Sequence, residues 1–368
     1  MASLQTDSRE TLAVSSKKTE MKKKLILLFI LKTIFLFAQI KDTEKKELKG
    51  NVKEVKYYKN GVLEKSYEFN EKGFFSKLNY FSNNKPQTAC EWIYNDEGQL
   101  ISIKDELNIQ NYKYNSDGKV IQITDLKTLK RDTIQVYYYK YENQNLIETV
   151  AYKYSEKNKR MWDKILYEYD TSNNLIKEVN YGASAVFIDK PKYPQKEMEN
   201  RIPIIYLYTY DLSNNLIEKV GRPENRNEIS SRYSYKYDSK NNKTEYRKEW
   251  PNNSASSYET YVYDDKNNLI EISSYNLDNE LIYKDIYTYD DNNNQTSRTH
   301  FFKNEKTTST ECIYDSKKNK IEERNYNKGK LRDIKTRVFD YFGNEIQLKI
   351  FDNNGKILFH FKSEIMYY

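Results

Sequence analysis

Hydrophobic and polar positions along this chain follow one short phrase that recurs twelve times between Phe69 and Phe351. Each copy reads aromatic, any residue, aromatic, Asp or Asn, two further residues, then Gly or Asn. Clear copies are YEYDTSNNLI at 167–176, YTYDLSNNLI at 208–217, YVYDDKNNLI at 261–270 and YKYNSDGKVI at 112–121. Alternating apolar positions that flank a polar segment predict two strands joined by a turn, and the repetition predicts an architecture built from that unit.

The position three residues after the acid indicates the kind of turn. It holds Gly or Asn in eleven of the twelve copies, and Lys318 is the exception. Gly lacks a Cβ atom and tolerates positive φ, and Asn is the next most tolerant residue. We therefore expect a left-handed residue that closes a type I hairpin turn with a bulge. The column comprises Gly73, Gly98, Gly118, Asn145, Asn173, Asn214, Asn241, Asn267, Asn293, Lys318, Gly343 and Gly355.

The acids that begin these turns are expected to cap them, because their carboxylates can accept hydrogen bonds from backbone N–H groups two or more residues on. A calcium site needs six to eight converging oxygens, whereas these acids recur once per hairpin along a sheet edge. We expect no metal and no cofactor. Glu142 is the one longer acid, in a copy that is one residue shorter. The expected structural turn residues include Asp170, Asn173, Asp211, Asn214, Asp264, Asn267, Asp290 and Asn293, and Asp352 begins the last turn.

Most copies are 25 to 28 residues apart, which fits two strands of about eight residues and two turns. The fold class predicted is all-β, a long antiparallel β-meander of hairpin repeats. About twenty strands would be too many for a flat open sheet, so we expect a sheet curled into a superhelical or shell-like surface. The tyrosine-rich face should be concave or packed against itself.

Tyrosines two residues apart lie on one face of a strand. We expect neighbouring copies to stack them into a ladder across strands. Because a tyrosine ring buries apolar area while its hydroxyl reaches water, this face is also a candidate binding surface. The candidate binding residues are Tyr167, Tyr169, Tyr208, Tyr210, Tyr261, Tyr263, Tyr287 and Tyr289.

The phrase YxYDxxGxL resembles the tyrosine-aspartate (YD) repeat of the rearrangement-hotspot (RHS) family, over about Tyr57 to Phe361. The resemblance implies strands that spiral into a hollow β-shell, and a protein that packages or displays something. Asn replaces Gly in half of the copies, and a further Asn stands where the family has a basic residue. These further asparagines are Asn174, Asn215, Asn242, Asn268 and Asn294. No core-domain signature and no toxin-like domain after Tyr368 is recognisable.

The N-terminal sequence predicts export. Residues 1–20 are a polar extension, and 21–38 read as a signal peptide with three lysines, an apolar stretch and Ala38 before the cleavage point. A membrane anchor is the alternative, although a stretch of thirteen residues falls short of the roughly 20 that span a bilayer. Residues 39–368 form the repeat domain, with a proline-rich loop insertion at 182–205. The mature chain should be extracellular, periplasmic or at the cell surface, without a membrane-spanning segment.

Charge and the rarer residues exclude several classes of function. Removing the four leader lysines from a net charge of +7 leaves +3, with acids and bases interspersed, so nucleic acid is not an expected partner. Cys90 and Cys312 are predicted to be buried thiols rather than a disulfide. His300 and His360 are read as sheet-face residues outside any nucleophile or metal motif, and the chain is predicted not to be an enzyme.

The function predicted first is an exported, non-catalytic scaffold at the cell surface. It would bind a glycan or a surface protein through the tyrosine face or the 182–205 loop, although that loop reads equally well as a tolerated surface insertion. The alternatives are an outer-membrane β-barrel, a surface hydrolase with an unrecognised site, and a component of an RHS-like export or toxin-delivery system.

Overall fold

The computed structural model describes residues 46, 48–83, 85–129, 132–155, 158–182, 202–251 and 256–368. The predicted extension, the signal peptide and most of the 182–205 insertion lie outside these residues. Within them, 24 strands form one sheet, and each strand pairs antiparallel with the next one along the chain. The expected all-β meander is thus confirmed, with more strands than the number estimated from the repeats.

The strands are β1 (Val52–Lys59), β2 (Val62–Phe69), β3 (Phe75–Ser82), β4 (Lys85–Tyr94), β5 (Leu100–Asp105), β6 (Asn108–Tyr114), β7 (Val120–Lys127), β8 (Thr133–Glu142), β9 (Asn145–Ser155), β10 (Asn158–Tyr169), β11 (Leu175–Asn180), β12 (Ile204–Tyr210), β13 (Leu216–Pro223), β14 (Ser231–Tyr237), β15 (Lys243–Glu249), β16 (Ser257–Tyr263), β17 (Leu269–Tyr275), β18 (Leu281–Tyr289), β19 (Gln295–Phe302), β20 (Glu305–Tyr314), β21 (Lys320–Asn327), β22 (Lys330–Phe339), β23 (Glu345–Asp352) and β24 (Ile357–Tyr367).

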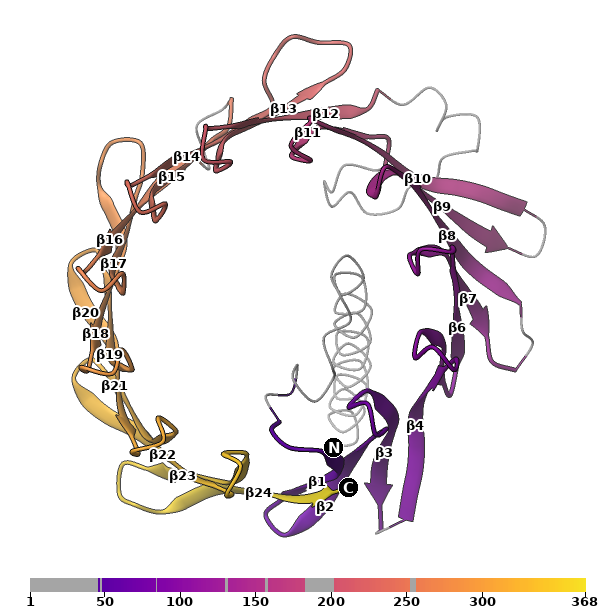
Figure 1. Ribbon diagram of the computed structural model, residues 1–368. Coiled ribbons are helices and arrows are strands. Elements are labelled where there is room, and N and C mark those ends of the chain that lie inside the picture. The colour runs from indigo at the N-terminus through magenta and orange to yellow at the C-terminus, as the bar shows by residue number, and fades with distance from the viewer. Residues whose placement is uncertain are drawn as a thin grey trace, which may run out of the picture.

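The sheet closes on itself because β1 also pairs antiparallel with β24, with Val55 opposite Ile365 and Tyr57 opposite Ser363. Figure 1 shows the resulting ring, with β1, β2 and β24 side by side. Closure removes both free edges of the sheet, and an unpaired strand edge is a template for aggregation. A shell-like curl was expected from the number of strands, and the structure shows that the curl is complete.

One asparagine stabilises the seam between β24 and β1. Asn344 accepts a hydrogen bond from the backbone N–H of Lys49 (2.6 Å) and donates one to the Lys49 carbonyl (2.9 Å). Its Nδ2 atom also lies 2.8 Å from the Tyr367 hydroxyl, which donates to Asp340. Asn344 is 1% exposed, so the segment before β1 and the end of β24 are joined through a buried amide.

The two faces of the ring differ in composition. The described residues just before β1, indigo in Figure 1, lie within the ring, and Lys46 Nζ is 4.4 Å from the centre of the Tyr67 ring. Tyr67 shares its face with Phe69 and, through strand pairing, with Val55 and Leu78. The aromatic face of the sheet is therefore the inner face, as expected for a concave surface on which side chains converge.

Apolar packing on this inner face is densest where the chain begins. Leu78, Cys90, Ile103, Tyr112 and Ile123 form a buried cluster across β3 to β7. A second cluster of Val52, Val55 and Phe69 packs beside the seam. Elsewhere the ring is a single layer whose inner side chains are mostly half-buried, so tyrosine, which tolerates partial hydration, suits these positions.

The outer face carries ion pairs instead. Pairs in which nitrogen and oxygen are 2.6 to 3.2 Å apart recur around the ring. Each such pair adds little to stability, but together they make the outside of the ring hydrophilic. They are Lys164–Glu148, Lys177–Glu168, Arg232–Glu218, Lys236–Glu245, Lys284–Glu271 and Lys362–Glu364.

The turns divide between two rims; Asp352 begins a turn as expected, whereas the expectation for Asn145 was wrong. Asp352 begins a turn between β23 and β24, on the rim opposite to the other acids of its column, because only twelve residues separate it from Asp340. Asn145 is not left-handed. Its copy is one residue shorter, so Asn143 (φ 44°) and Gln144 (φ 71°) form a two-residue turn and Asn145 already pairs within β9.

Candidate functional site

The capping acids hold the turns of one rim, which we call the Asp rim. In the turn at Asp170, Oδ1 accepts hydrogen bonds from the backbone N–H groups of Ser172 and Asn174, both at 2.8 Å. Asn173 adopts φ 63°, and its N–H donates to the Asp170 carbonyl at 3.0 Å. The turns that begin at Asp211, Asp264 and Asp290 repeat this geometry, with φ of 62°, 65° and 61° at Asn214, Asn267 and Asn293.

In several turns a second asparagine joins the turn to the next one along the rim. Asn174 Nδ2 donates to its own Asp170 at 3.0 Å and to Asn214 of the following hairpin at 3.1 Å. The same link runs from Asn215 to Asn241 (2.9 Å) and from Asn268 to Asn293 (3.1 Å). The ladder uses both asparagines that depart from the RHS phrase. The second Asn donates both of its amide protons, and the Asn in the left-handed column accepts one through a side-chain oxygen that Gly lacks.

These contacts leave the rim carboxylates little capacity for a ligand. Hydrogen bonds from the side chain and backbone of Asn215 hold the pKa of Asp211 below its usual range, and Asn268 does the same for Asp264. Among the residues that the structure describes, no group of three or more His, Cys, Asp or Glu side chains is placed to hold a metal ion.

In most turns of the Asp rim the tyrosine before the acid donates its hydroxyl proton to the neighbouring hairpin. Tyr169 donates its hydroxyl to the Leu146 carbonyl (3.0 Å), Tyr210 to Leu175 (3.0 Å) and Tyr289 to Leu269 (2.8 Å). Tyr263 donates to the Lys243 carbonyl at 3.1 Å. Four of the eight candidate binding tyrosines therefore use their only hydroxyl proton to fasten the sheet.

The other four candidates lie one pleat further from the rim. Tyr208 donates to Glu178 (3.0 Å) and Tyr261 to Glu259 (2.5 Å). Burial, aided by nearby acids, raises the pKa of Tyr167 to about 12, and the Arg298 guanidinium lies 5.9 Å from the centre of the Tyr287 ring. That these tyrosines bind a ligand stays a prediction. Because most of their hydroxyls already have partners, the predicted contacts are with the faces of the rings.

The continuous tyrosine ladder was a wrong expectation. Among the described residues, no ring contact joins two of these eight tyrosines. Successive copies lie two strands apart, roughly 9 to 10 Å, which is too far for stacking. A lysine from the intervening strand fills the gap, as Lys219 does with its Nζ 4.4 Å from the Tyr206 ring and 5.0 Å from the Tyr208 ring. Direct stacks occur elsewhere, for example between Tyr235 and Tyr246 (5.3 Å).

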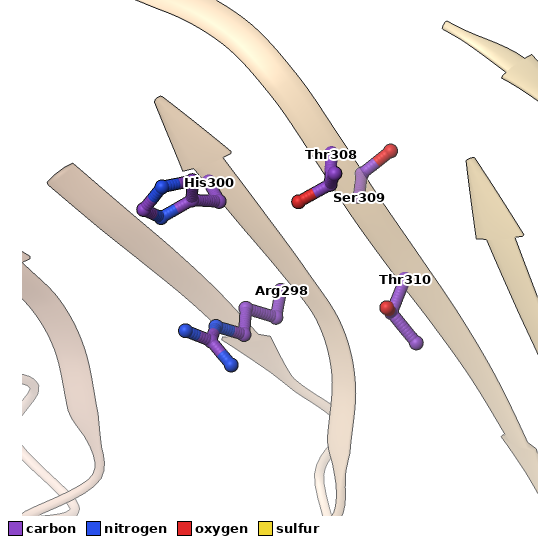
Figure 2. A pocket seen from close by; sticks show the side chains of 5 residues that line it. All are labelled: Arg298, His300, Thr308, Ser309 and Thr310. Atoms are coloured by element: carbon purple, nitrogen blue, oxygen red, sulfur yellow. The ribbon is translucent and has the colours of Figure 1, made fainter. Parts of the chain in front are cut away.

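A charged stripe interrupts the aromatic face over β18 to β22, and we call it the polar stripe. Its first part is Asp285, which is 4% exposed and receives Arg298 Nε at 3.1 Å and Arg298 Nη2 at 3.0 Å. His300 Nδ1 lies 3.0 Å from the same carboxylate. Arg298 and His300 line a pocket together with Thr308, Ser309 and Thr310, as Figure 2 shows.

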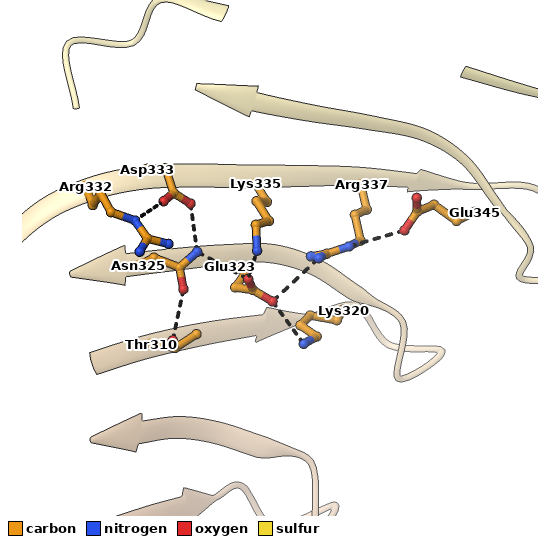
Figure 3. Close-up of polar contacts among 9 residues, drawn as sticks. All are labelled: Thr310, Lys320, Glu323, Asn325, Arg332, Asp333, Lys335, Arg337 and Glu345. Atoms are coloured by element: carbon orange, nitrogen blue, oxygen red, sulfur yellow. Dashed lines mark hydrogen bonds and ion pairs between the residues drawn. The ribbon is translucent and has the colours of Figure 1, made fainter. Parts of the chain in front are cut away.

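The second part of the polar stripe is centred on Glu323 (Figure 3). Lys335 Nζ lies 2.6 Å, Lys320 Nζ 3.1 Å and Arg337 Nη2 3.5 Å from its carboxylate oxygens. Burial alone would raise the pKa of Glu323, but hydrogen bonds from Lys335, Asn325 and Lys320 outweigh it and lower the pKa to about 2. The carboxylate is therefore a fixed negative charge inside the ring.

Three contacts join the parts of the stripe and extend it. Thr310 donates to Asn325 at 2.9 Å, and Asn325 donates to Asp333 at 2.8 Å. Arg337 Nε also pairs with Glu345 at 3.2 Å. The stripe thus offers fixed charges and hydrogen-bond donors on an otherwise aromatic inner wall, an arrangement that can hold a polar group.

Sequence reasoning missed this stripe, although a signal was present. The residues that share the tyrosine parity in β18 are Tyr283, Asp285, Tyr287 and Tyr289, so one acid stands in a row of tyrosines. In β22 that parity reads Asp333, Lys335, Arg337 and Phe339. Three charged residues therefore precede Phe339 on the inner face of β22. They mark the place where this face changes from aromatic to charged.

The cysteines, His360 and Trp250 make contacts that fit structural roles. Cys90 and Cys312 are free and buried, as predicted. His360 Nε2 lies 3.0 Å from Gln347 on the outer face. Trp250 packs edge-on against Tyr233, 6.3 Å between ring centres. Most of the 182–205 loop lies outside the described residues. In the described part of the chain, no helix is long and apolar enough to cross a membrane.

Comparison with known proteins gives similarities of fold. No protein-family model matches the sequence, and no curated protein matches it either. Among solved structures, the chain is similar to a TcdB2–TccC3–Cdc42 complex (12% identity, TM-score 0.36, 80% of this chain and 19% of that chain). It is also similar to a porin-like protein from Bacteroides uniformis (9% identity, TM-score 0.26, 86% and 96%). The chain spans about a fifth of the TcdB2–TccC3 chain, and neither similarity indicates what this chain binds.

Proposed function

We propose that the chain is an exported, water-soluble β-shell that encloses a polypeptide segment against its aromatic inner wall. The observation that carries the proposal is the pairing of β1 with β24, which turns the meander into a closed ring. With strands about 4.8 Å apart, 24 of them make a ring roughly 37 Å across between backbones. Side-chain layers of about 5 Å on each wall leave roughly 25 Å, enough for an extended chain or for a helix of 10 to 12 Å.

The inner wall supports a polypeptide as the enclosed molecule. Partly hydrated tyrosine rings alternate with lysine stems, and such amphipathic surface can contact both apolar side chains and peptide groups. The polar stripe adds charges of both signs at fixed positions, as in the Asp285–Arg298 pair. The resemblance of the repeats to the RHS phrase, which implies a hollow packaging shell, supports the same proposal.

The charge distribution favours water over lipid around the ring. A transmembrane barrel needs an uncharged outer band, and each Lys or Arg at the bilayer midplane costs about 2 to 4 kcal/mol. Here Lys164 lies in the middle of β10 and pairs with Glu148 on the outer face, and Lys284 with Glu271 does the same in β18 and β17. The inner face carries charges as well, so neither face provides the apolar band. The predicted leader supports export of the soluble shell.

A matched pair of photo-crosslinking residues tests the proposal. Tyr208 and Thr209 are neighbours on opposite faces of β12, with Tyr208 inside. A photo-reactive phenylalanine analogue at position 208 should capture one recurrent polypeptide that resists protease until the shell is unfolded. The same analogue at 209 should not.

Three other results would contradict it. A chain that leaves the membrane fraction only with detergent, and that captures lipid from position 209, would indicate an outer-membrane barrel. Capture of a glycan at 208 would instead support the surface-binding scaffold. Absence of any protected polypeptide at 208 in shell purified from cells that export it would refute enclosure.

A further inference from the structure

The polar stripe contains a notch in the aromatic layer. On the inner face of β20, the short side chains of Thr308 and Thr310 lie opposite His300 and Arg298 of β19. The short threonine side chains leave a shallow pocket of about 240 Å³ between the two strands. In Figure 2, Arg298, His300 and Thr308 border this pocket, whereas the Ser309 side chain turns to the opposite face.

Arg298 is held in the pocket by one edge of its guanidinium. Its Nε and Nη2 atoms bind the two oxygens of Asp285, and the Tyr287 ring lies 5.9 Å from its Cζ atom. The Arg298 side chain is nevertheless 52% exposed. A guanidinium has a second edge, formed by Nη1 and Nη2, that matches two oxygens of a carboxylate or phosphate. That edge has no partner among the described residues, and its orientation is fixed in advance by Asp285.

The neighbouring groups add polar atoms around the same space. His300 binds Asp285 through Nδ1 (3.0 Å), which leaves Nε2 without a partner among the described residues. The Thr308 hydroxyl has no partner there either, and Thr310 donates its proton to Asn325. Asp285 is 4% exposed, and its carboxylate already has three polar partners. Its negative charge is therefore balanced beneath the pocket.

We propose that this pocket is a binding site for a small oxyanion, a carboxylate or a phosphate. The free guanidinium edge of Arg298 would bind two oxygens, with the Thr308 hydroxyl as an additional hydrogen-bond donor and the His300 ring beside it. A cation is disfavoured by the arginine, and an apolar group would leave these polar groups without partners. The site does not depend on the enclosure of a polypeptide, because it requires only the fold and the five pocket residues.

The two histidines make the test site-specific. In a sample with ¹⁵N-labelled histidine, His300 reports on the pocket and His360, on the outer face, is the internal control. Inorganic phosphate and glutarate are titrated separately at constant ionic strength. The proposal predicts a saturable shift of the His300 ring signals with at least one of the two anions, which then identifies the oxyanion, and no saturable shift at His360.

Substitutions then locate the contact. Arg298→Lys keeps the charge but loses the paired edge, and it should weaken binding by about tenfold or more, since a hydrogen bond to a charged group contributes about 1.5 to 3 kcal/mol. Thr308→Val should weaken it by roughly fivefold through one lost donor. Arg324→Gln, which removes an outer-face guanidinium paired with Glu322, should change nothing.

Several results would overturn the proposal. They are equal shifts at both histidines, no saturation with either anion, and unchanged affinity in Arg298→Lys and Thr308→Val. Circular dichroism checks that the variants fold. If Arg298→Lys loses its structure, Thr308→Val, which leaves the Asp285 contacts intact, decides the outcome.

Discussion

Lys318 offers a direct test of how the Asp rim is stabilised. It is the only residue of the left-handed column that is neither Gly nor Asn, yet it adopts φ 66°, close to the values of the column's asparagines other than Asn145. A residue with a Cβ atom incurs roughly 1 to 2 kcal/mol in this conformation, and Asn incurs less. Little offsets that cost, because the Lys318 ammonium makes one exposed contact with the Asn292 carbonyl at 3.4 Å and has only a solvent-screened attraction to the Asp290 carboxylate.

Lys318→Asn should also extend the asparagine ladder. Asn294 Nδ2 donates to Asp290 at 2.9 Å and retains a second proton. In the preceding turn the equivalent Asn268 uses that proton to reach Asn293 at 3.1 Å. An exposed neutral hydrogen bond contributes about 0.5 kcal/mol. Together with the lower backbone strain, the substitution should stabilise the protein by roughly 1 to 1.5 kcal/mol.

Urea unfolding, followed by circular dichroism, measures this change as a shift of the midpoint at constant slope. Lys317→Asn is the matched control, because it removes a neighbouring lysine at a position with ordinary φ. Lys318→Val should destabilise the protein. Equal midpoints for Lys318→Asn, Lys318→Val and the natural chain would refute the reasoning that left-handed backbone governs this column.

Three further predictions concern the turns, the polar stripe and the seam. Asn267→Gly should be nearly neutral, because the relief of strain offsets one long 3.3 Å ladder bond, whereas Asn267→Val should cost on the order of 1 to 2 kcal/mol; equal melting temperatures would contradict the turn geometry. The folded-state pKa of Glu323 is lowered to about 2 from an ordinary value of 4.5, so its ion pairs stabilise the fold above about pH 4.5 and are lost as the pH falls towards 2. Glu323→Gln should therefore cost roughly 2 kcal/mol at pH 7 and little at pH 2.5, and urea titrations with the same cost at both pH values would exclude this role. Tyr367→Phe removes the hydroxyl that joins Asp340 and Asn344, and faster hydrogen exchange should follow at β1 and β24 but not at β12; unchanged exchange at the seam would show that this contact does not hold it.

The turns were predictable because their cause is local. Asp170 to Asn174 contains the capping carboxylate, the left-handed residue and the amide that closes the turn, so five consecutive residues specify one geometry. The prediction for Asn145 was wrong because a single missing residue replaces a bulged turn by a two-residue turn. Asp352 kept the turn chemistry, but a twelve-residue spacing moved it to the opposite rim.

The ring closure and the polar stripe depend on contacts that no repeat encodes. Val55 and Ile365 pair across 310 positions, and Lys49, whose backbone Asn344 binds at the seam, lies before the first copy of the phrase. Asp285, Arg298 and Thr308 become neighbours only once the registers of three strands are known. Charged residues at every second position of β22 could have indicated the stripe. Which side chains contact one another depends on the register between strands, and one strand alone does not give that register.

The central claim is that β24 pairs with β1, and a disulfide across that seam tests it most directly. Lys56 and Glu364 are Cα partners on the outer face of the two strands, and antiparallel partners fall within the distance that a disulfide spans. The natural thiols need not be removed, because both are buried and burial raises the pKa of Cys90 to about 12. The chain with Lys56→Cys and Glu364→Cys should form an intramolecular disulfide on mild oxidation, seen as faster migration on a non-reducing gel, whereas Lys56→Cys with Glu218→Cys should not. If both thiols at 56 and 364 stay free, or bridge only between molecules, the ring is open and this account of the protein is wrong.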